Sequence, residues 1–309
     1  MRRFLLLICC WTVCSAAFVM VPSSRSRRQS NSATFNERQR ASFPVALAPT
    51  PVNQVEIWKD AEEVGARIRQ IVQTAAQKAI AERGHFALAI PGGSILKMLA
   101  TTTPPADGDW TSKTTVAYVN HKCVPMNDGT LATHAKARQL FLDQWTGVQV
   151  VTLDGTDDGP AEARSYQAKL QALVDANILP CKNNNGDVPQ FDLALIGVGD
   201  DGHIGSLYPN RPEVLETTDW VLSVAMKSPP SITLSLPVMA SARQVIVAAC
   251  GVSDKYPQGK SEGMRRAVVA EEETLESFPA VGLRPVATWV MDQAAASKLG
   301  SEYGVVMSP

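Results

Sequence analysis

His203 is the side chain in this sequence best suited to moving a proton at neutral pH. It lies in the glycine-rich stretch 197–209, directly after the apolar run 191–196. A neutral imidazole in such a loop can take a proton from water. Asp200 and Asp201 precede it, and a carboxylate beside the ring can orient the ring and raise its basicity. These residues predict a general base with an acidic partner; the alternative is a loop histidine that only caps backbone carbonyls.

A second candidate site consists of Gly92, Gly93 and Ser94, which follow the apolar run 86–90 and begin a predicted helix. Glycines let backbone N–H groups come close to an anion, and the start of a helix carries partial positive charge. Ser94 can cap the helix or donate to a phosphate oxygen. The motif therefore predicts a phosphate site, with an ordinary strand-to-helix turn as the alternative.

Two lysines follow other predicted strands and bring positive charge to the same edge of the sheet. Lys122 comes after the run 114–119, and Lys255 comes after the run 244–249. We expect both to close on a phosphate held by the di-glycine turn. The alternative for each, taken alone, is a solvated surface position.

Several other chemistries are not favoured. Gly197, Gly199 and Gly202 match GxGxxG, but a dinucleotide site needs a long helix next, and Pro209 cuts that helix short. Cys123 is expected to be a buried thiol rather than a nucleophile. The four histidines lack metal-ligand spacing, and the three cysteines beyond residue 48 form no paired motif, so no metal site is predicted.

Charge is distributed unevenly along the 309 residues. The first 48 residues contain seven arginines and one glutamate, so the remaining 22 basic and 29 acidic residues leave a net charge of −7. An acidic body argues against a nucleic-acid surface, which needs a clustered basic stripe. With 45% hydrophobic residues the composition is globular, and no apolar run is long enough to span a bilayer.

These residues must be positioned by alternating helices and strands, which predict an α/β fold. We expect three layers, with a mostly parallel sheet covered by helices and a ligand site at the carboxyl ends of the strands. The predicted strands are 86–90, 114–119, 148–152, 191–197, 220–224, 232–236, 244–249 and 287–290. The predicted helices are 58–83, 95–101, 130–145, 160–176, 263–273 and 293–299.

Residues 1–48 are expected to be a disordered leader, and 49–309 a catalytic domain. The apolar run 4–13 after two arginines has the length of a signal-peptide core, and small residues follow at 15–17. The next stretch is rich in serine and arginine, as transit peptides are. The combination resembles the bipartite leader of algae with secondary plastids, which predicts the plastid stroma and no membrane contact in the mature form. An ordinary secretory signal followed by a linker is the alternative.

The chain resembles 6-phosphogluconolactonase, a family with a Rossmann-like, sugar-phosphate isomerase/deaminase-like α/β fold. The likeness covers most of residues 54–300, and the most specific piece is 197–203. It implies that His203 is the general base and that the substrate is a sugar-phosphate lactone. It also implies that no metal or organic cofactor is needed. The other segments that carry the resemblance are 92–94, 123–125, 204–209, 232–237 and 289–296.

The sequence also departs from the family pattern. Asn120-His121-Lys122 stands where the family has Asp-Glu-Arg, Ser231 stands where an arginine is usual, and the loop before Lys255 is one residue longer. Lysine keeps the charge of arginine without its bidentate fork, and serine keeps neither. Two alternatives to a lactonase therefore stay open. One is a paralogue that binds sugar phosphates without turnover, and the other is an amino-sugar-phosphate deaminase or isomerase.

Overall fold

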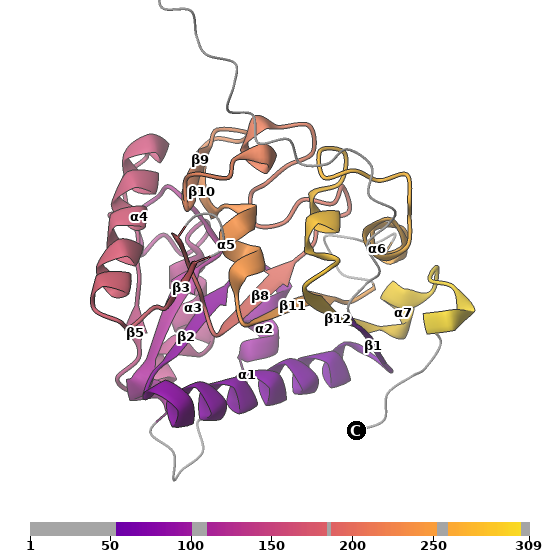
Figure 1. Ribbon diagram of the computed structural model, residues 1–309, viewed down its shortest axis with the longest axis horizontal. Helices are drawn as coiled ribbons and strands as arrows, with labels where there is room; N and C mark the ends of the chain where they lie inside the picture. Colours follow the sequence, from indigo (N-terminus) through magenta and orange to yellow (C-terminus); the bar gives the residue numbers. More distant parts are fainter. Residues whose placement is uncertain (1–53, 101–109, 184–186, 252–258, 304–309) are drawn as a thin grey trace, which may run out of the picture. The chain divides into compact units, whose positions relative to one another are not determined.

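The computed structural model describes residues 54–100, 110–183, 187–251 and 259–303. The predicted leader, its boundary at residue 48 and Lys255 lie outside these ranges. Within them, a seven-stranded sheet has the order β1-β12-β11-β8-β2-β3-β5, and every neighbouring pair is parallel (Figure 1). Its strands are β1 (Gln54–Trp58), β2 (Phe86–Ile90), β3 (Thr114–Tyr118), β5 (Gln149–Val150), β8 (Leu193–Gly197), β11 (Gln244–Ala249) and β12 (Ala287–Asp292).

Helices cover both faces of this sheet, as predicted. In Figure 1, α1 runs below the sheet and α5 lies above it. Parallel strands covered on both faces read as continuous apolar runs, and all five residues of β2 and of β3 are buried. The helices are α1 (Ala61–Arg83), α2 (Ser94–Leu99), α3 (Thr133–Leu140), α4 (Gly159–Asp175), α5 (Leu236–Ser241), α6 (Ser261–Val268) and α7 (Gln293–Ala296). The 3₁₀-helices are η1 (Thr111–Lys113), η2 (Leu142–Gln144), η3 (Pro212–Leu215), η4 (Pro279–Leu283) and η5 (Ser301–Tyr303).

One buried charge in the core is compensated. The Asp192 carboxylate precedes β8 and is 5% exposed. It forms an ion pair with Arg83 at the end of α1, and it accepts the Ala87 N–H at 2.7 Å. A buried carboxylate is tolerated only with such partners, so this cluster ties α1 to the centre of the sheet.

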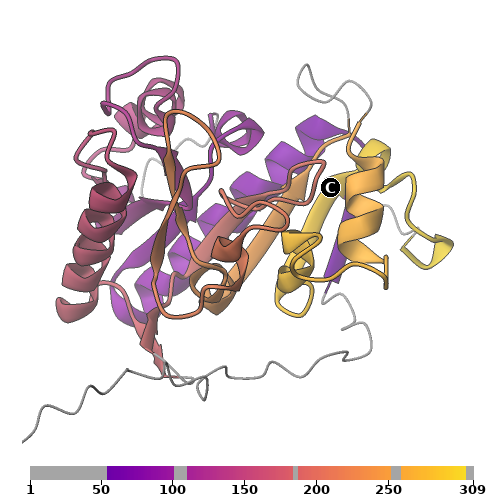
Figure 2. The same cartoon turned by 90° about the horizontal axis from the view of Figure 1, so that it is seen from above.

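The structure corrects the sequence-based prediction at a second sheet. The predicted strands near 220 and 232 are β9 (Val221–Val224) and β10 (Ser231–Leu234), but they do not join the parallel sheet. They pair antiparallel with each other, and β10 pairs with β4 (Asn120–Lys122), which was expected to be a loop. In Figure 2 this three-stranded sheet lies beside α4, which packs on β9 and β10. It brings residues 120–122 and 231 together.

Other differences concern short or polar elements. Strand β1 and the hairpin of β6 (Cys181–Asn183) and β7 (Asp187–Pro189) were not predicted. The first helix begins at Ala61 rather than Trp58, because the Asp60 carboxylate caps it by accepting the N–H groups of residues 62 and 63. The predicted helices 130–145 and 263–273 are shorter, as α3 and α6.

Candidate active site

His203 lies in the loop of residues 199–210, which we call the histidine loop. This loop is built on glycines that have no room for a side chain. Gly199 N–H donates to the His203 carbonyl at 2.9 Å, and Gly202 N–H donates to the Gly199 carbonyl at 3.1 Å. A Cβ on Gly199 would lie 2.1 Å from Nδ1 of His203. Gly202 has a φ of 86°, in the left-handed region that favours glycine. The backbone therefore folds tightly enough to bring the imidazole back over the loop.

Asp201 holds the His203 ring in one orientation. Its Oδ1 lies 2.6 Å from Nδ1 of His203 and also accepts the His203 backbone N–H at 3.1 Å. Burial alone would raise the pKa of Asp201, but the hydrogen bonds and charge of His203 outweigh burial and lower this pKa to about 2. Because an ionised carboxylate only accepts, Nδ1 carries the proton of the neutral ring, and Nε2 keeps its lone pair.

Tyr208 lies beside this imidazole, and Lys227 lies over the Tyr208 ring. The Tyr208 ring centroid is 4.8 Å from that of His203, and the Lys227 ammonium is 5.0 Å from the Tyr208 centroid. Lys227 lies between β9 and β10, so it reaches the histidine loop from the second sheet. Neither residue was predicted as a site residue from the sequence.

The di-glycine turn takes the position expected of it, at the carboxyl end of β2. Gly93 has a φ of 85° and is the N-cap residue of α2, so Ser94 is the first helical residue rather than the cap. A Cβ on Gly92 would lie 3.1 Å from Oγ1 of Thr133, at the start of α3. The turn thus presents an exposed backbone between two helix starts.

One cavity of about 800 Å³ brings the predicted residues together. Gly92, Gly93, Ser94, Lys122 and His203 all line it. Its charged lining among the described residues consists of five lysines, with no aspartate or glutamate. These lysines are Lys97, Lys122, Lys136, Lys227 and Lys260. A second cavity of about 660 Å³, between α4 and η3, contains none of the predicted site residues. The chemistry and the positive charge therefore converge on the first cavity.

Comparison with known proteins identifies the family of the chain. The family model described as glucosamine-6-phosphate isomerases/6-phosphogluconolactonase matches residues 59–291. The chain belongs to this family. A rat protein named 6-phosphogluconolactonase is 31% identical over 272 residues, covering 83% of this chain and 97% of its own length. An Arabidopsis thaliana protein named 6-phosphogluconolactonase 3, chloroplastic, is 30% identical and covers 80% of this chain and 75% of its own length.

Solved structures in this family share the fold. The crystal structure of 6-phosphogluconolactonase from Leishmania guyanensis superposes with a TM-score of 0.66 at 23% identity. The match covers 80% of this chain and 98% of that one. At this identity the likeness concerns the arrangement of the elements, which confirms the predicted α/β fold with its mostly parallel sheet.

Two of the expected departures from the family pattern, Lys122 and Ser231, lie opposite each other across one strand pair. Ser231 on β10 pairs with Lys122 on β4, and both line the cavity. The single positive charge of this pair is therefore supplied from β4 rather than from position 231. This juxtaposition was not visible in the sequence, because 109 residues separate the two positions.

His121 does not replace the missing arginine. Its ring is 1% exposed, and burial lowers its pKa to about 4. Nδ1 lies 2.6 Å from the Lys122 carbonyl, and Nε2 accepts the backbone N–H of His134 at 3.1 Å. The neutral ring thus satisfies one N–H at the start of α3 and fastens that helix to β4. Its role is to hold two cavity walls together.

Sequence reasoning missed Lys260. This residue immediately precedes α6, is 8% exposed and donates from Nζ to the Val198 carbonyl at 3.0 Å. It lines the cavity, whereas Lys255 lies outside the described residues.

The remaining candidates have structural partners. Cys123 is fully buried, and burial raises the pKa of its thiol to about 12, which agrees with the expected inert thiol. His85 lies 2.9 Å from the Thr115 hydroxyl, and His134 lies 2.7 Å from the Tyr118 hydroxyl. In the described part of the chain, no three His, Cys, Asp or Glu residues gather as a metal site would require. Nor does any helix described there combine the length and apolarity needed to cross a bilayer.

Proposed function

We propose that this chain hydrolyses 6-phospho-D-glucono-1,5-lactone to 6-phosphogluconate, the lactonase step of the oxidative pentose phosphate pathway. Membership of the family and the names of its relatives support the reaction class. One observation in the molecule carries the proposal. His203, which is held by Asp201, and the turn 92–94 line the same lysine-rich cavity. A proton acceptor and an anion site are therefore arranged around one space.

The substrate is held in the cavity mainly through its phosphate group. Backbone N–H groups at Gly92 and Gly93 and the Ser94 hydroxyl are donors suited to phosphate oxygens. Lys122 and Lys260 supply positive charge in the same cavity, and Lys255 is a further predicted contributor outside the described residues. A charge-assisted hydrogen bond of this kind contributes about 1.5–3 kcal/mol. This anchoring leaves the lactone ring to be presented to His203.

The chemistry requires one proton shuttle. Nε2 of His203 takes a proton from water while the water oxygen attacks the lactone carbonyl, and Asp201 stabilises the imidazolium that forms. Loop N–H groups stabilise the oxyanion. As the tetrahedral intermediate collapses, the bond to the ring oxygen breaks and His203 returns its proton to that oxygen. Because a lactone is already an activated ester, these steps use no metal or organic cofactor.

The test is to purify residues 49–309 and follow loss of the lactone by NMR against its spontaneous hydrolysis. The wild type is expected to accelerate the loss strongly, and His203→Ala should reduce kcat by at least about a hundredfold, the scale of general-base catalysis. Equal rates for both proteins would overturn the proposal. Calorimetry then identifies the alternatives, since sugar-phosphate binding without turnover indicates a binding paralogue. Ammonia release from an amino-sugar phosphate indicates a deaminase.

We further propose that the mature protein works in the plastid stroma. The leader composition of residues 1–48 motivates this, and the existence of a chloroplastic relative is consistent with it. Fusing residues 1–48 to a fluorescent protein in an alga with a secondary plastid should place fluorescence inside the plastid. Fluorescence in the secretory pathway or medium would favour the alternative of an ordinary signal peptide.

A further inference from the structure

The histidine loop is braced from outside the cavity by residues 276–280, which we call the bracing segment. Ala280 N–H donates to the Gly202 carbonyl at 3.0 Å, and Asn210 N–H donates to the Glu276 carbonyl at 2.8 Å. These two bonds fall on either side of His203 along the chain. The backbone of the loop is therefore attached at both ends to one short segment.

Phe278 fills the space beneath the loop. Its ring is fully buried, and a Cβ on Gly202 would lie 2.4 Å from its Cγ. The ring consequently lies directly against the loop backbone, next to the residue that precedes His203. Interiors are packed closely enough that a shift of this ring is passed on to the loop.

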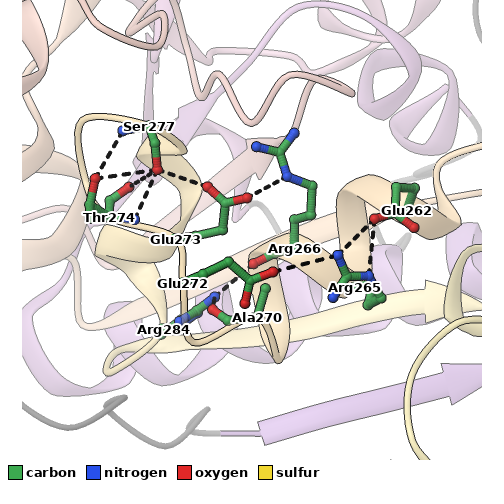
Figure 3. Close-up of polar contacts among 9 residues, drawn as sticks. All are labelled: Glu262, Arg265, Arg266, Ala270, Glu272, Glu273, Thr274, Ser277 and Arg284. Atoms are coloured by element: carbon green, nitrogen blue, oxygen red, sulfur yellow. Dashed lines mark hydrogen bonds and ion pairs between the residues drawn. The ribbon is translucent and has the colours of Figure 1, made fainter.

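Arg266 on α6 lies over the ring of Phe278. Its guanidinium carbon is 4.5 Å from the Phe278 ring centroid, a cation–π contact. Its Nε lies 2.5 Å from Oε1 of Glu273, whose Oε2 accepts the Ser277 hydroxyl at 2.8 Å (Figure 3). The Glu273 side chain is only 8% exposed. Arg266 is thereby fixed to the turn that leads into the bracing segment.

The buried Arg284, which follows η4, connects η4 to the end of α6. Its guanidinium donates to the carbonyls of Arg266 and Ala270 at 2.7 Å (Figure 3). It also donates to the Ala267 carbonyl at 2.6 Å. These carbonyls belong to the end of α6 and the residues that follow it. The helix that carries Arg266 is therefore attached to the end of η4 by the Arg284 side chain.

We propose that Arg266 is a positioning residue for the reaction. Held by Glu273, it keeps Phe278 pressed against Gly202, and so fixes where the His203 imidazole stands relative to the substrate carbonyl. Arg266 is not among the residues that line the cavity, so it acts through the loop rather than by contacting substrate. The inference rests on the proposed function for its kinetic consequence, but its structural consequence is independent of turnover.

The experiment compares Arg266→Gln with Arg265→Gln. Arg265 is the matched control, because it lies on the same helix, is also 34% exposed and forms ion pairs with Glu262 and Glu272. Figure 3 shows its guanidinium in contact with Glu262 and Glu272 rather than with Glu273. We expect Arg266→Gln to lower kcat about tenfold with KM changed less than twofold, since small misplacements of reacting groups carry large rate costs. Arg265→Gln should change neither value more than twofold, and Arg266→Lys should restore part of kcat.

Hydrogen exchange measured by mass spectrometry supplies the readout that needs no turnover. Amides of residues 199–210 should exchange faster in Arg266→Gln than in the wild type and in Arg265→Gln. Equal exchange in all three proteins would overturn the inference, whether or not the lactone is hydrolysed. An effect on KM alone, or equal kcat losses in both variants, would also overturn it. Absence of lactonase activity in the wild type would instead count against the proposed function.

Discussion

The two sides of the cavity are built in different ways. On one side, His203 stands on a loop whose shape is determined by backbone hydrogen bonds and by glycines with no room for a side chain. On the other side, Lys122 and Ser231 face each other across a short antiparallel strand pair, with Lys136 on the neighbouring helix α3. The first side is fixed by the backbone, whereas the second presents charges on long, flexible side chains.

This difference is consistent with the departures that the resemblance implies. Residues 197–203 are the most specific piece of that resemblance, whereas two of the expected departures lie at 120–122 and 231. A group that exchanges protons must stand within hydrogen-bond distance of the reacting atom, so its loop tolerates little change. An ammonium ion attracts phosphate from a range of positions, so the charge can move from one strand to its neighbour. We therefore expect substitutions on the first side to lower kcat and those on the second to raise KM.

The largest effect is expected from Gly202→Ala. The left-handed φ of 86° and the 2.4 Å approach to Phe278 mean that the loop must shift to admit a methyl group. A shift of about 1 Å should lower kcat on the order of a hundredfold, with a smaller change in KM. Steady-state kinetics of lactone hydrolysis measure kcat and KM, and urea unfolding shows whether the variant is folded under the assay conditions.

Gly129→Ala is the control, because a methyl group at this position would have no heavy atom within 4 Å and the φ of Gly129 is not positive. It should keep kcat within twofold. If Gly202→Ala also kept wild-type kcat, the backbone of this loop would not be what fixes the imidazole, and the contrast between the two sides would fail.

An intermediate effect is expected at the strand pair. Lys122→Ala should raise KM about tenfold or more, the lower end expected for losing one charge-assisted hydrogen bond, with kcat within threefold. Adding Ser231→Arg to this variant should recover much of the loss, because position 231 is directly opposite. Lys78→Ala, at a 74% exposed position on α1, should leave both constants unchanged. A large fall in kcat for Lys122→Ala would show that this side also positions reacting atoms.

The smallest effect concerns stability rather than catalysis. Burial lowers the pKa of His121 to about 4, whereas an unfolded histidine titrates near 6.5. Between these values the unfolded chain binds more protons, so the free energy of unfolding falls as the pH drops from about 6.5 towards 4. At pH 5 this single group should cost about 2 kcal/mol relative to pH 7.5.

His121→Gln retains an acceptor and a donor but does not titrate, so its stability should depend less on pH. Urea unfolding at pH 5, 6 and 7.5 measures the difference between the two proteins. If the variant lost stability on acidification as steeply as the wild type, the connection between β4 and α3 would not be the acid-sensitive point on this side of the cavity.

The sequence predicted the central elements of the fold because burial on both faces leaves a clear pattern. The apolar runs at 86–90, 191–197 and 244–249 correspond to β2, β8 and β11. Polar elements escaped prediction. Strand β4 consists of an asparagine, a histidine and a lysine, and only its pairing with the distant β10 makes it a strand. Long-range pairing of this kind leaves no local periodicity to detect.

The candidate site was predictable to a similar degree. His203, Asp201 and the turn 92–94 could be identified because glycine, carboxylate and imidazole at short spacing imply a local geometry. Lys260 and Lys227 could not, since their place in the cavity depends on how α6 and the β9–β10 connection fold back over the sheet. The sequence shows which local groups react, and tertiary folding determines which distant charges surround them.

The absence of carboxylates from the described cavity wall has a consequence for the end of the catalytic cycle. Opening a lactone converts a neutral ester into an acid that ionises at once, so the molecule leaving the cavity carries one more negative charge than the molecule that entered. Surrounding ammonium groups attract the departing species more strongly than the arriving one. Mobile salt weakens that attraction at partly exposed sites. The rate of product release should therefore depend on the ionic strength of the compartment.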